Sequence, residues 1–298
     1  MSQDLNALNR EAVAAAKHYM GQVSWLTVVL TIFVLLAYCA NLALFASGVL
    51  NPWIATGIMG ALTHMSYTPL HEAVHGNISG KNDQLRWLNA ACGYLMAPLI
   101  ANPYSSHHLE HFTHHRFTNQ PGKDPDYIVR GMREGLLGVL VTLFRFFWLQ
   151  NTFFVIEHWR NAAVKDRAIY CAEVSFSLGW RVAFLALVTT PGAGWVILFG
   201  YFLGGLFSTY WFAYRPHAPY KDSARYRNTN SLVMPAWMKP VGWFWLGQHL
   251  HSIHHLFPRV PFYHYHALHR EIEPILRAQG TPIVGIFTRE PVPAGQRD

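Results

Sequence analysis

The chain has 298 residues, of which 51% are hydrophobic and only 13% are charged, and that charged share is about half of what a soluble domain carries. This composition excludes a disordered or collagen-like chain and argues against a freely soluble protein. The formal net charge of +7 would suit a nucleic-acid-binding protein, but its distribution along the chain points elsewhere.

The first segment, residues 1–22, is predicted to be an amphipathic helix because Leu5, Leu8 and Ala12 recur on one face. It contains acids and bases, and the apolar run after it is too long for the core of a signal peptide. We therefore expect a helix on the cytoplasmic surface, then a membrane domain over residues 23–276 and a C-terminal tail over residues 277–298.

The first membrane hairpin is predicted from a stretch without Asp, Glu, Lys or Arg that runs from His18 to His71. Residues 47–52 (Ser-Gly-Val-Leu-Asn-Pro) break this stretch near its middle. A helix needs about 20 apolar residues to cross roughly 30 Å of hydrocarbon. The segments Ser24–Ser47 and Trp53–Leu70 therefore fit as an antiparallel pair of spans.

The central region, Gly80–Arg181, mixes apolar and charged residues. Trp87–Ile100 has the length of a short buried or re-entrant helix. Leu136–Ile156 is strongly aromatic but carries Arg145, which favours a helix in the plane of the membrane interface over a fifth span.

A second hairpin is predicted over Val182–Tyr214, which has no charged residue and is interrupted at Thr190–Gly194. Its first arm is long enough only if it begins before Arg181, whose side chain would then lie at the interface with its head group in water. The expected fold class is an all-α integral membrane protein with about four transmembrane helices in two hairpins.

The basic residues predict the orientation of these spans. All 23 Lys and Arg residues lie outside the two hairpin turns, so the positive-inside rule places the basic loops and both termini in the cytoplasm. Membrane topology thus accounts for the positive charge, and we expect no nucleic acid among the partners.

The 18 histidines of the chain are concentrated in three short motifs, HEAVH, HFTHH and HSIHH. The spacing within each motif places the imidazoles on one face of a helix. Neutral imidazole is a ligand of iron, zinc, copper and nickel, so each motif is typical of a metal site. The histidines of the three motifs are His71, His75, His111, His114, His115, His251, His254 and His255.

Eight ligands exceed what one metal ion can hold, so the motifs suit two ions with four or five ligands each. A ninth candidate is His217, just after the last predicted span. In the predicted topology all nine lie at or beneath the cytoplasmic ends of the spans, which predicts a cytoplasmic helical cap with a histidine-rich site for two metal ions. Four nearby histidines are candidates for further ligands or for their support: His64, His107, His108 and His249.

Two other functions fit parts of this pattern. His71-Glu72-Ala-Val-His75 also matches HExxH, in which two histidines bind zinc and the glutamate is the general base of a metalloprotease. That function leaves two motifs unexplained. A membrane metal transporter would need ionisable residues within its spans, and the predicted spans contain no acidic residue.

As a set, three histidine boxes of the form HxxxH, HxxHH and HxxHH around two membrane hairpins resemble the integral-membrane fatty-acid desaturase and hydroxylase superfamily. The resemblance covers roughly Trp53–Leu276. It implies two non-haem irons that activate O2 and oxidise an unactivated C–H bond, held by the eight box histidines with His217 as an extra ligand. No catalytic residue is expected beyond these metal ligands.

Within the superfamily, the sequence is most similar to carotenoid β-ring hydroxylases and ketolases. Three segments carry this similarity: Phe117–Tyr127 after the second box, Tyr214–Pro219 around the extra histidine, and His254–Tyr263 at the third box. Three positions depart from the pattern of those enzymes and leave the substrate open: Glu72, Arg215 and Ala218.

The resemblance therefore predicts an O2-dependent enzyme acting on a long lipid. Hydroxylation of a carotenoid ring, such as that of β-carotene, is the main interpretation, and a fatty-acyl desaturase or hydroxylase is the alternative. Both substrates require an apolar tunnel, which the aromatic residues of segments 144–154 and 243–245 could line.

The irons would need further support from this chain and from a partner. Metal-binding histidines require acceptors for their second ring nitrogen, and Glu110, Asp124 and Asp126 lie close to the second box in sequence. An external electron donor such as a ferredoxin is expected, because the sequence shows no Rossmann glycine pattern and no iron–sulfur cysteine set. The basic cytoplasmic face would attract such an acidic carrier.

Overall fold

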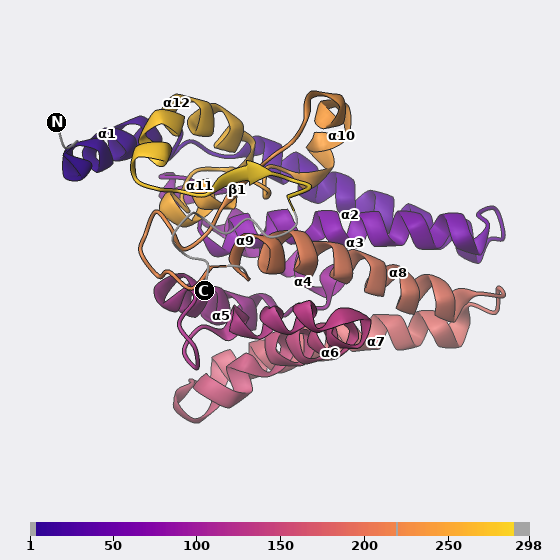
Figure 1. The fold of residues 1–298 in the computed structure, drawn as a ribbon. Coiled ribbons are helices and arrows are strands. Elements are labelled where there is room, and N and C mark those ends of the chain that lie inside the picture. Colours follow the sequence, from indigo (N-terminus) through magenta and orange to yellow (C-terminus); the bar gives the residue numbers. More distant parts are fainter. Residues whose placement is uncertain (1–3, 219, 289–298) are drawn as a thin grey trace.

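Figure 1 shows a computed structural model of the chain, which describes residues 4–218 and 220–288. Residues 1–3 of the predicted N-terminal segment, Pro219 of the predicted loop around the extra histidine, and residues 289–298 of the predicted tail lie outside the described residues. The described chain is mostly helical, which confirms the predicted fold class.

Twelve α-helices and two short strands are formed by the described residues, with a 3-10 stretch and a π-helical stretch that matter for the site. The α-helices are α1 (Leu5–Lys17), α2 (Trp25–Ala46), α3 (Pro52–Val74), α4 (Trp87–Ile100), α5 (Tyr104–Phe117), α6 (Gly135–Phe153), α7 (Val164–Leu187), α8 (Ala193–Ser208), α9 (Arg215–His217), α10 (Lys239–Gly242), α11 (His251–Leu256) and α12 (Tyr265–Ala278). The strands are β1 (Ser231–Val233) and β2 (Ile283–Gly285), and two of the further helical stretches are the 3-10 stretch η2 (Pro125–Glu134) and the π-helical stretch η5 (Thr209–Tyr214).

Four long helices form two hairpins, α2–α3 and α7–α8, whose turns lie at the same end of the molecule (Figure 1). In the first turn Gly48 adopts a φ of +77°, which lets the chain leave α2. The side chain of Asn51 then accepts a hydrogen bond from the Trp53 N–H at 2.9 Å, and Pro52 occupies the first turn of α3. Both hairpins are confirmed where the sequence predicts them.

By length and hydropathy, four helical stretches of the described chain could cross a membrane: Trp25–Ala46, Pro125–Asn161, Val164–Leu187 and Ala193–His217. The number of candidate spans agrees with the prediction of about four, but the helices that qualify are not all the predicted ones. Leu136–Ile156, which was expected to lie in the interface plane, belongs to one of the four, and α3 does not. The hydropathy of α3 is lowered by small and polar residues because α2, α4 and α8 pack around it, and a helix covered by protein needs little apolar surface for lipid.

Glycines bring α3 and α8 together. A Cβ atom on Gly204 would lie 2.6 Å from the carbonyl oxygen of Gly60, and one on Gly200 would lie 2.6 Å from the side chain of Met59. Only glycine permits this spacing, as in other closely packed membrane helices. Helix α8 is thereby fixed against the helix that carries the first histidine motif.

The side chain of Arg181, in α7, is held by protein groups. Its guanidinium donates hydrogen bonds to the carbonyl oxygens of Ser177 at 2.7 Å and Leu99 at 3.0 Å, and it lies over the ring of Trp180. The last carbonyls of a helix lack partners within that helix, so the end of α4 supplies an acceptor that the sequence alone could not place. The expected head group in water is thus replaced by internal hydrogen bonds.

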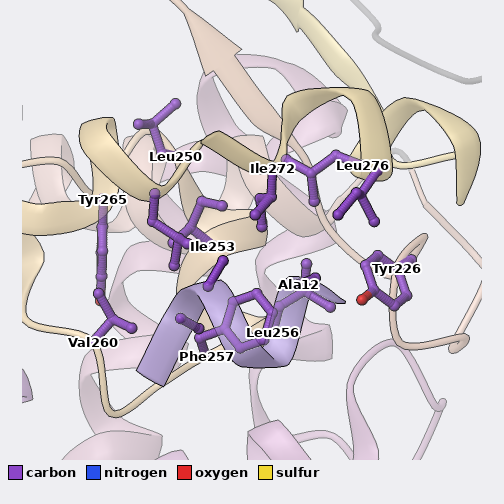
Figure 2. Close-up of a cluster of buried hydrophobic side chains, with 14 of the residues drawn as sticks. Ala12, Tyr226, Leu250, Ile253, Leu256, Phe257, Val260, Tyr265, Ile272 and Leu276 are labelled. Carbon is purple, nitrogen blue, oxygen red and sulfur yellow. The ribbon is translucent and has the colours of Figure 1, made fainter. Parts of the chain in front are cut away.

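A cap of α1, α11, α12 and the strands lies away from the two hairpin turns (Figure 1). Figure 2 shows its apolar core, in which Ala12 of α1 packs among Ile253 and Leu256 of α11 and Ile272 of α12. The predicted amphipathic helix forms as α1, and its apolar face packs on α11 and α12. Since a helix as short as α11 is not stable alone, this core holds the third histidine motif in its helical form.

The two strands also position α11. β1 and β2 pair in parallel, with Ser231 opposite Ile283. The amide of Leu232 in β1 donates to the carbonyl of His249 at 2.8 Å, immediately before α11. Neither strand was predicted, since three residues are too few for an alternating pattern to be detected, and β2 lies in the segment expected to be a tail.

Candidate metal centre

Four separate elements carry the predicted metal ligands to one place. α3 supplies the first motif near its C-terminal end, α5 supplies the second, α9 supplies a single histidine, and α11 supplies the third. The structure brings together all nine histidines that the sequence predicts as ligands: His71, His75, His111, His114, His115, His217, His251, His254 and His255.

Four of these histidines, His71, His75, His111 and His254, form what we call group A. One nitrogen from each ring lies within 4.8 Å of those from the other three, and all four residues are buried. The Nε2 atoms of His71 and His254 are 3.1 Å apart, and those of His75 and His111 are 2.9 Å apart. Group A therefore gathers four ring nitrogens around one point.

Four others, His114, His217, His251 and His255, form group B, whose nitrogens also lie within 4.8 Å of one another. The Nε2 atoms of His114 and His255 are 3.3 Å apart. The ring of His217 lies between those of His114 and His255, with centroids 4.6 Å and 4.7 Å away. A second set of four nitrogens thus converges beside the first.

His115 joins the two groups. Its Nε2 atom lies 3.0 Å from that of His111 and 2.8 Å from that of His254, both in group A. Its ring stacks on the ring of His255, in group B, with centroids 4.3 Å apart and planes 20° from parallel. If each group held one metal ion, the ninth histidine would lie next to both ions and could be a ligand of either.

The chemistry of this donor set fits transition-metal ions. Burial lowers the pKa of His111 and His254 well below the ordinary value, and it lowers that of His251 to about 3, so these rings are neutral near pH 7 and can act as ligands. Two nitrogens that bind the same ion, each at about 2.1 Å and with bonds at right angles, lie about 3 Å apart. The Nε2 pairs His71–His254 and His75–His111 have this spacing. Neither ring nitrogen of the buried His217 has a hydrogen-bond partner among the described residues, and a metal ion would supply one.

Asp124 orients one of the rings. Its Oδ1 atom lies 2.8 Å from Nδ1 of His114, and its two oxygens also accept hydrogen bonds from the amides of Asn119 at 2.7 Å and Asp126 at 2.9 Å. The carboxylate is thus fixed, and it holds a proton on Nδ1 so that Nε2 faces group B. Burial lowers the pKa of His114, but the carboxylates of Asp126 and Asp124 outweigh it and raise that pKa to about 9. A metal ion at Nε2 would replace the second ring proton.

The other two acids predicted to support the ligands are placed less directly. Oδ2 of Asp126 is 3.7 Å from Nδ1 of His114. Among the described residues, the side chain of Glu110 forms no hydrogen bond with any of the nine predicted ligands. Its Oε2 atom lies 3.1 Å from Nδ1 of His107 instead. Burial raises the pKa of Glu110 to about 7.

His107 and Tyr265 complete the surroundings of the rings. The His107 ring lies 5.2 Å from that of His111, and its buried Nε2 atom has no partner in the described chain. The hydroxyl of Tyr265 lies 3.2 Å from Nδ1 of His254. The sequence offers a signal for His107, which precedes His111 by one helical turn, but none for the tyrosine.

Several nearby histidines lie outside both groups. His64 is hydrogen-bonded to the hydroxyl of Ser208 and the carbonyl of Phe244, so it joins α3 to α8 and to the segment before α11. His249 contacts the ring of His266. His108 contacts the ring of Phe112.

Glu72 counts against a metalloprotease. Its buried Oε1 atom accepts a hydrogen bond from the side chain of Asn77 at 3.2 Å, and Asn77 also donates to the carbonyl of Pro258 in the loop after α11, while Oε2 of Glu72 has no partner in the described chain. The general base of an HExxH site must reach a metal-bound water, whereas one oxygen of this carboxylate binds Asn77 and the protease motif accounts for only two of the nine gathered histidines.

A cavity of about 370 Å³ opens beside the histidines. His107, His111, His114 and His251 line it, and side chains of α6 and α8, most of them apolar, form much of the remaining wall. The predicted aromatic lining is found in the segment 144–154, which contributes Phe144, Phe146 and Phe147, but not at residues 243–245.

Comparisons with known proteins agree with this arrangement. The family model described as fatty acid desaturase matches residues 46–287, a range that contains all nine histidines. Fatty acid conjugase FAC2 B of Calendula officinalis is 25% identical over 297 aligned residues, covering 85% of this chain and 77% of that protein. Fatty acid conjugase FAC2 A of the same plant is 24% identical over 286 residues, covering 80% of this chain and 72% of that protein.

Proposed function

The chain belongs to the fatty acid desaturase family, and from this premise we propose that it is a membrane-bound, O2-dependent oxidoreductase that oxidises C–H bonds of a fatty acyl chain. The observation that carries the proposal is that histidines of both four-histidine groups line one mostly apolar cavity. The product is a double bond or a hydroxyl group on that chain.

The comparisons favour the acyl chain over the carotenoid ring that the sequence motifs suggested. Both Calendula relatives are named for fatty acids, and no comparison supports a carotenoid substrate. The motifs around the histidine boxes form the metal site, and enzymes that act on different substrates can share such a site. These motifs therefore say little about the residues that line the cavity. The fatty-acyl alternative therefore becomes the main interpretation.

We propose that groups A and B each hold one iron, with His115 beside both. When bound, two non-haem irons supply the oxidant that an unactivated C–H bond requires. The residues of this chain have separate tasks. Asp124 keeps the proton of His114 on Nδ1, and the buried, uncharged rings of group A keep their lone pairs free for metal.

The cavity wall would position the substrate. Leu140 and Phe144 of α6 and Phe202 and Leu206 of α8 all line it, and an acyl chain lying among them would be shielded from water and held against the histidines. The wall near His107 is polar, so the part of the substrate next to the irons meets hydrogen-bonding groups while the rest meets hydrocarbon.

We further propose the topology predicted from the basic residues. The hairpin turns would lie outside the cytoplasm, and the metal centre and both termini would lie within it. A membrane domain over residues 23–276 would then be flanked by the amphipathic segment 1–22 and the tail 277–298, of which α1 and β2 pack on the cap.

The proposal is tested by expressing the chain in cells that accumulate β-carotene and comparing acyl chains and pigments by mass spectrometry. We expect newly unsaturated or hydroxylated acyl chains with the wild type, none with His114→Ala, and wild-type products with the exposed control His18→Ala. Oxygenated carotenoid with unchanged acyl chains would overturn the proposal in favour of a carotenoid ring. Unchanged lipids and pigments would contradict both.

A further inference from the structure

A small pocket of about 70 Å³ contains none of the nine histidines and shares no lining residue with the substrate cavity. It is several times larger than the roughly 10–15 Å³ that one water needs, so it can hold a group of a few heavy atoms. Two cations, Lys81 and Arg259, line it together with three glycines, and no acidic residue does. The pocket therefore suits a small anionic group.

Two segments of the chain cross at this pocket. The amide of Lys81 donates a hydrogen bond to the carbonyl of Gly21 at 3.0 Å. Gly80 adopts a φ of +56°, and a Cβ atom there would overlap the carbonyl oxygen of Gln22, so only glycine permits the crossing. A Cβ atom on Gly21 would lie 2.9 Å from Cε of Lys81. The stem of Lys81 thus packs on bare glycine backbone, which holds its ammonium beside the pocket.

A third segment, the loop after α11, supplies the second cation. Asn77, which also lines the pocket, donates hydrogen bonds to the carboxylate of Glu72 at 3.2 Å and to the carbonyl of Pro258 at 3.0 Å. Arg259 follows Pro258 directly. Glu72 belongs to the first histidine motif, and Arg259 lies four residues after the third. The pocket therefore lies where the segments that carry these two motifs are joined.

Neither cation has an acidic partner in the described chain. Lys81 and Arg259 are exposed, and neither forms an ion pair with a described acid. Asp83, two residues after Lys81, is bound by Arg86 at 2.8 Å instead. Two like charges that line one pocket repel each other, and an anion between them would turn this repulsion into two attractions.

The pocket lies at the depth of lipid head groups. Helix α2 is a candidate span of 22 residues and is about 33 Å long, which matches a hydrocarbon thickness of roughly 30 Å. Gly21 comes just before α2, at the end opposite to the hairpin turn. Trp25, the first residue of α2, is 58% exposed, as is usual for tryptophan at a membrane interface. Lipid phosphates are therefore among the anions nearest to the pocket.

We propose that Lys81 and Arg259 bind a phosphate group in this pocket. The group comes from one of two sources, the head group of a membrane lipid or a free phosphate ion, and both offer the same charged oxygens to the two cations. A phosphate bound to both side chains links the first-motif and third-motif segments, so it stabilises the folded protein by mass action. The site lies beyond the proposed function and does not depend on it.

The test uses the full-length protein, purified and delipidated in a neutral detergent at constant ionic strength. The two phosphate sources are dioleoylphosphatidylglycerol and inorganic phosphate. Dioleoylglycerol, which lacks the phosphate, is the lipid control, and chloride is the ion control. Native mass spectrometry measures lipid binding, and the midpoint of thermal unfolding measures stabilisation by either source.

Three double variants are compared with the wild type. Lys81→Gln/Arg259→Gln removes both charges, and Lys81→Arg/Arg259→Lys keeps them. Arg160→Gln/Lys165→Gln removes two exposed cations outside the pocket and is the matched control. We expect the charge-removing variant to bind the phosphatidylglycerol about 25-fold more weakly, about fivefold for each cation, and to unfold without ligand at the wild-type temperature. The other two variants should bind it as the wild type does.

The two sources give different supporting results. Stabilisation by inorganic phosphate as well as by the phosphatidylglycerol would show that the phosphate group is sufficient, and stabilisation by the phosphatidylglycerol alone would identify a lipid as the source. The proposal is overturned if the wild type binds neither source, if it binds dioleoylglycerol equally well, or if removing Lys81 and Arg259 changes the affinity no more than the matched control does. The single variant Lys81→Gln, with a fivefold loss expected, gives the same comparison if the double variant folds poorly.

Discussion

The metal centre and the cavity beside it are built in opposite ways. The centre consists of polar side chains whose nitrogens meet at distances near 3 Å, and one of them is fixed by a carboxylate that itself accepts two amide hydrogen bonds. The cavity wall, apart from its polar part near His107, consists mainly of apolar side chains from α6 and α8. A change in the centre should therefore act on metal and rate, and a change in the cavity should act on the choice of substrate.

The sharpest contrast is expected from His254→Ala. This ring meets His71 and His115 and is the third-motif member of group A, so its loss should remove about one equivalent of iron and lower activity by more than about 100-fold, the upper end of what loss of an outer partner costs. Metal analysis and turnover measure the two effects. His249→Ala, just outside the motif, is the control and should keep both irons. A His254→Ala protein with two irons would break the assignment of group A.

Asp124→Asn tests the support of a ring rather than the ring itself. The amide is a weaker acceptor for Nδ1–H of His114, so metal affinity should fall by about 10- to 100-fold. Competition with a chelator measures the change, and Asp83→Asn, an exposed acid paired with Arg86 at the surface, should behave as the wild type. An unchanged metal affinity would mean that the hydrogen bond from His114 to Asp124 is not needed for metal binding.

The cavity is probed at Gly205 of α8. A Cβ atom there would meet nothing within 4 Å, although the residue lines the cavity, whereas the neighbouring Gly204 is needed for the contact with α3. Gly205 is 12 residues before His217, about 18 Å along the helix. A leucine at position 205 should therefore fill space that the distal part of an acyl chain uses.

We expect Gly205→Leu to keep its iron and its folding while its preference shifts to shorter acyl chains. Each methylene that no longer fits forfeits about 0.8 kcal/mol of burial, so the loss of two lowers kcat/KM for a long chain by about tenfold. Competition between acyl chains of different length measures the shift. Gly179→Leu, which also has open space but lies on α7 away from the cavity, is the matched control, and a variant profile equal to that of the control would show that the cavity does not hold the chain.

The same contrast explains what the sequence could predict. Histidines spaced three and four residues apart can be recognised in the sequence as a cluster, because one helical turn places them on one face. The structure gathers all nine predicted rings. The uncharged stretches likewise report the two hairpins. The cavity leaves no such pattern, since Phe147 and Phe202 come to line one cavity only through the packing of helices far apart in the chain.

Other misses have the same origin. The uncharged stretch 53–70 predicted a span like the others, but α3 is less hydropathic because its glycines and polar residues serve contacts with α8. The partners of Arg181 lie on α4, 82 residues away. The carotenoid substrate was inferred from motifs at the centre, which describe the chemistry and not the cavity wall.

Tyr265→Phe gives the smallest expected effect and lies on the border between the two regions. The hydroxyl supports His254 by a hydrogen bond at 3.2 Å, while the ring belongs to the apolar core of the cap (Figure 2). One neutral hydrogen bond is worth about 1 kcal/mol, so metal affinity should fall by about fivefold, less than in Asp124→Asn, because a phenol oxygen is a weaker acceptor than a carboxylate. Chelator competition on both variants in parallel, with Tyr263→Phe as control, ranks the two supports. Equal losses would mean that burial of the rings, and not the charge of their acceptor, determines how firmly the centre holds metal.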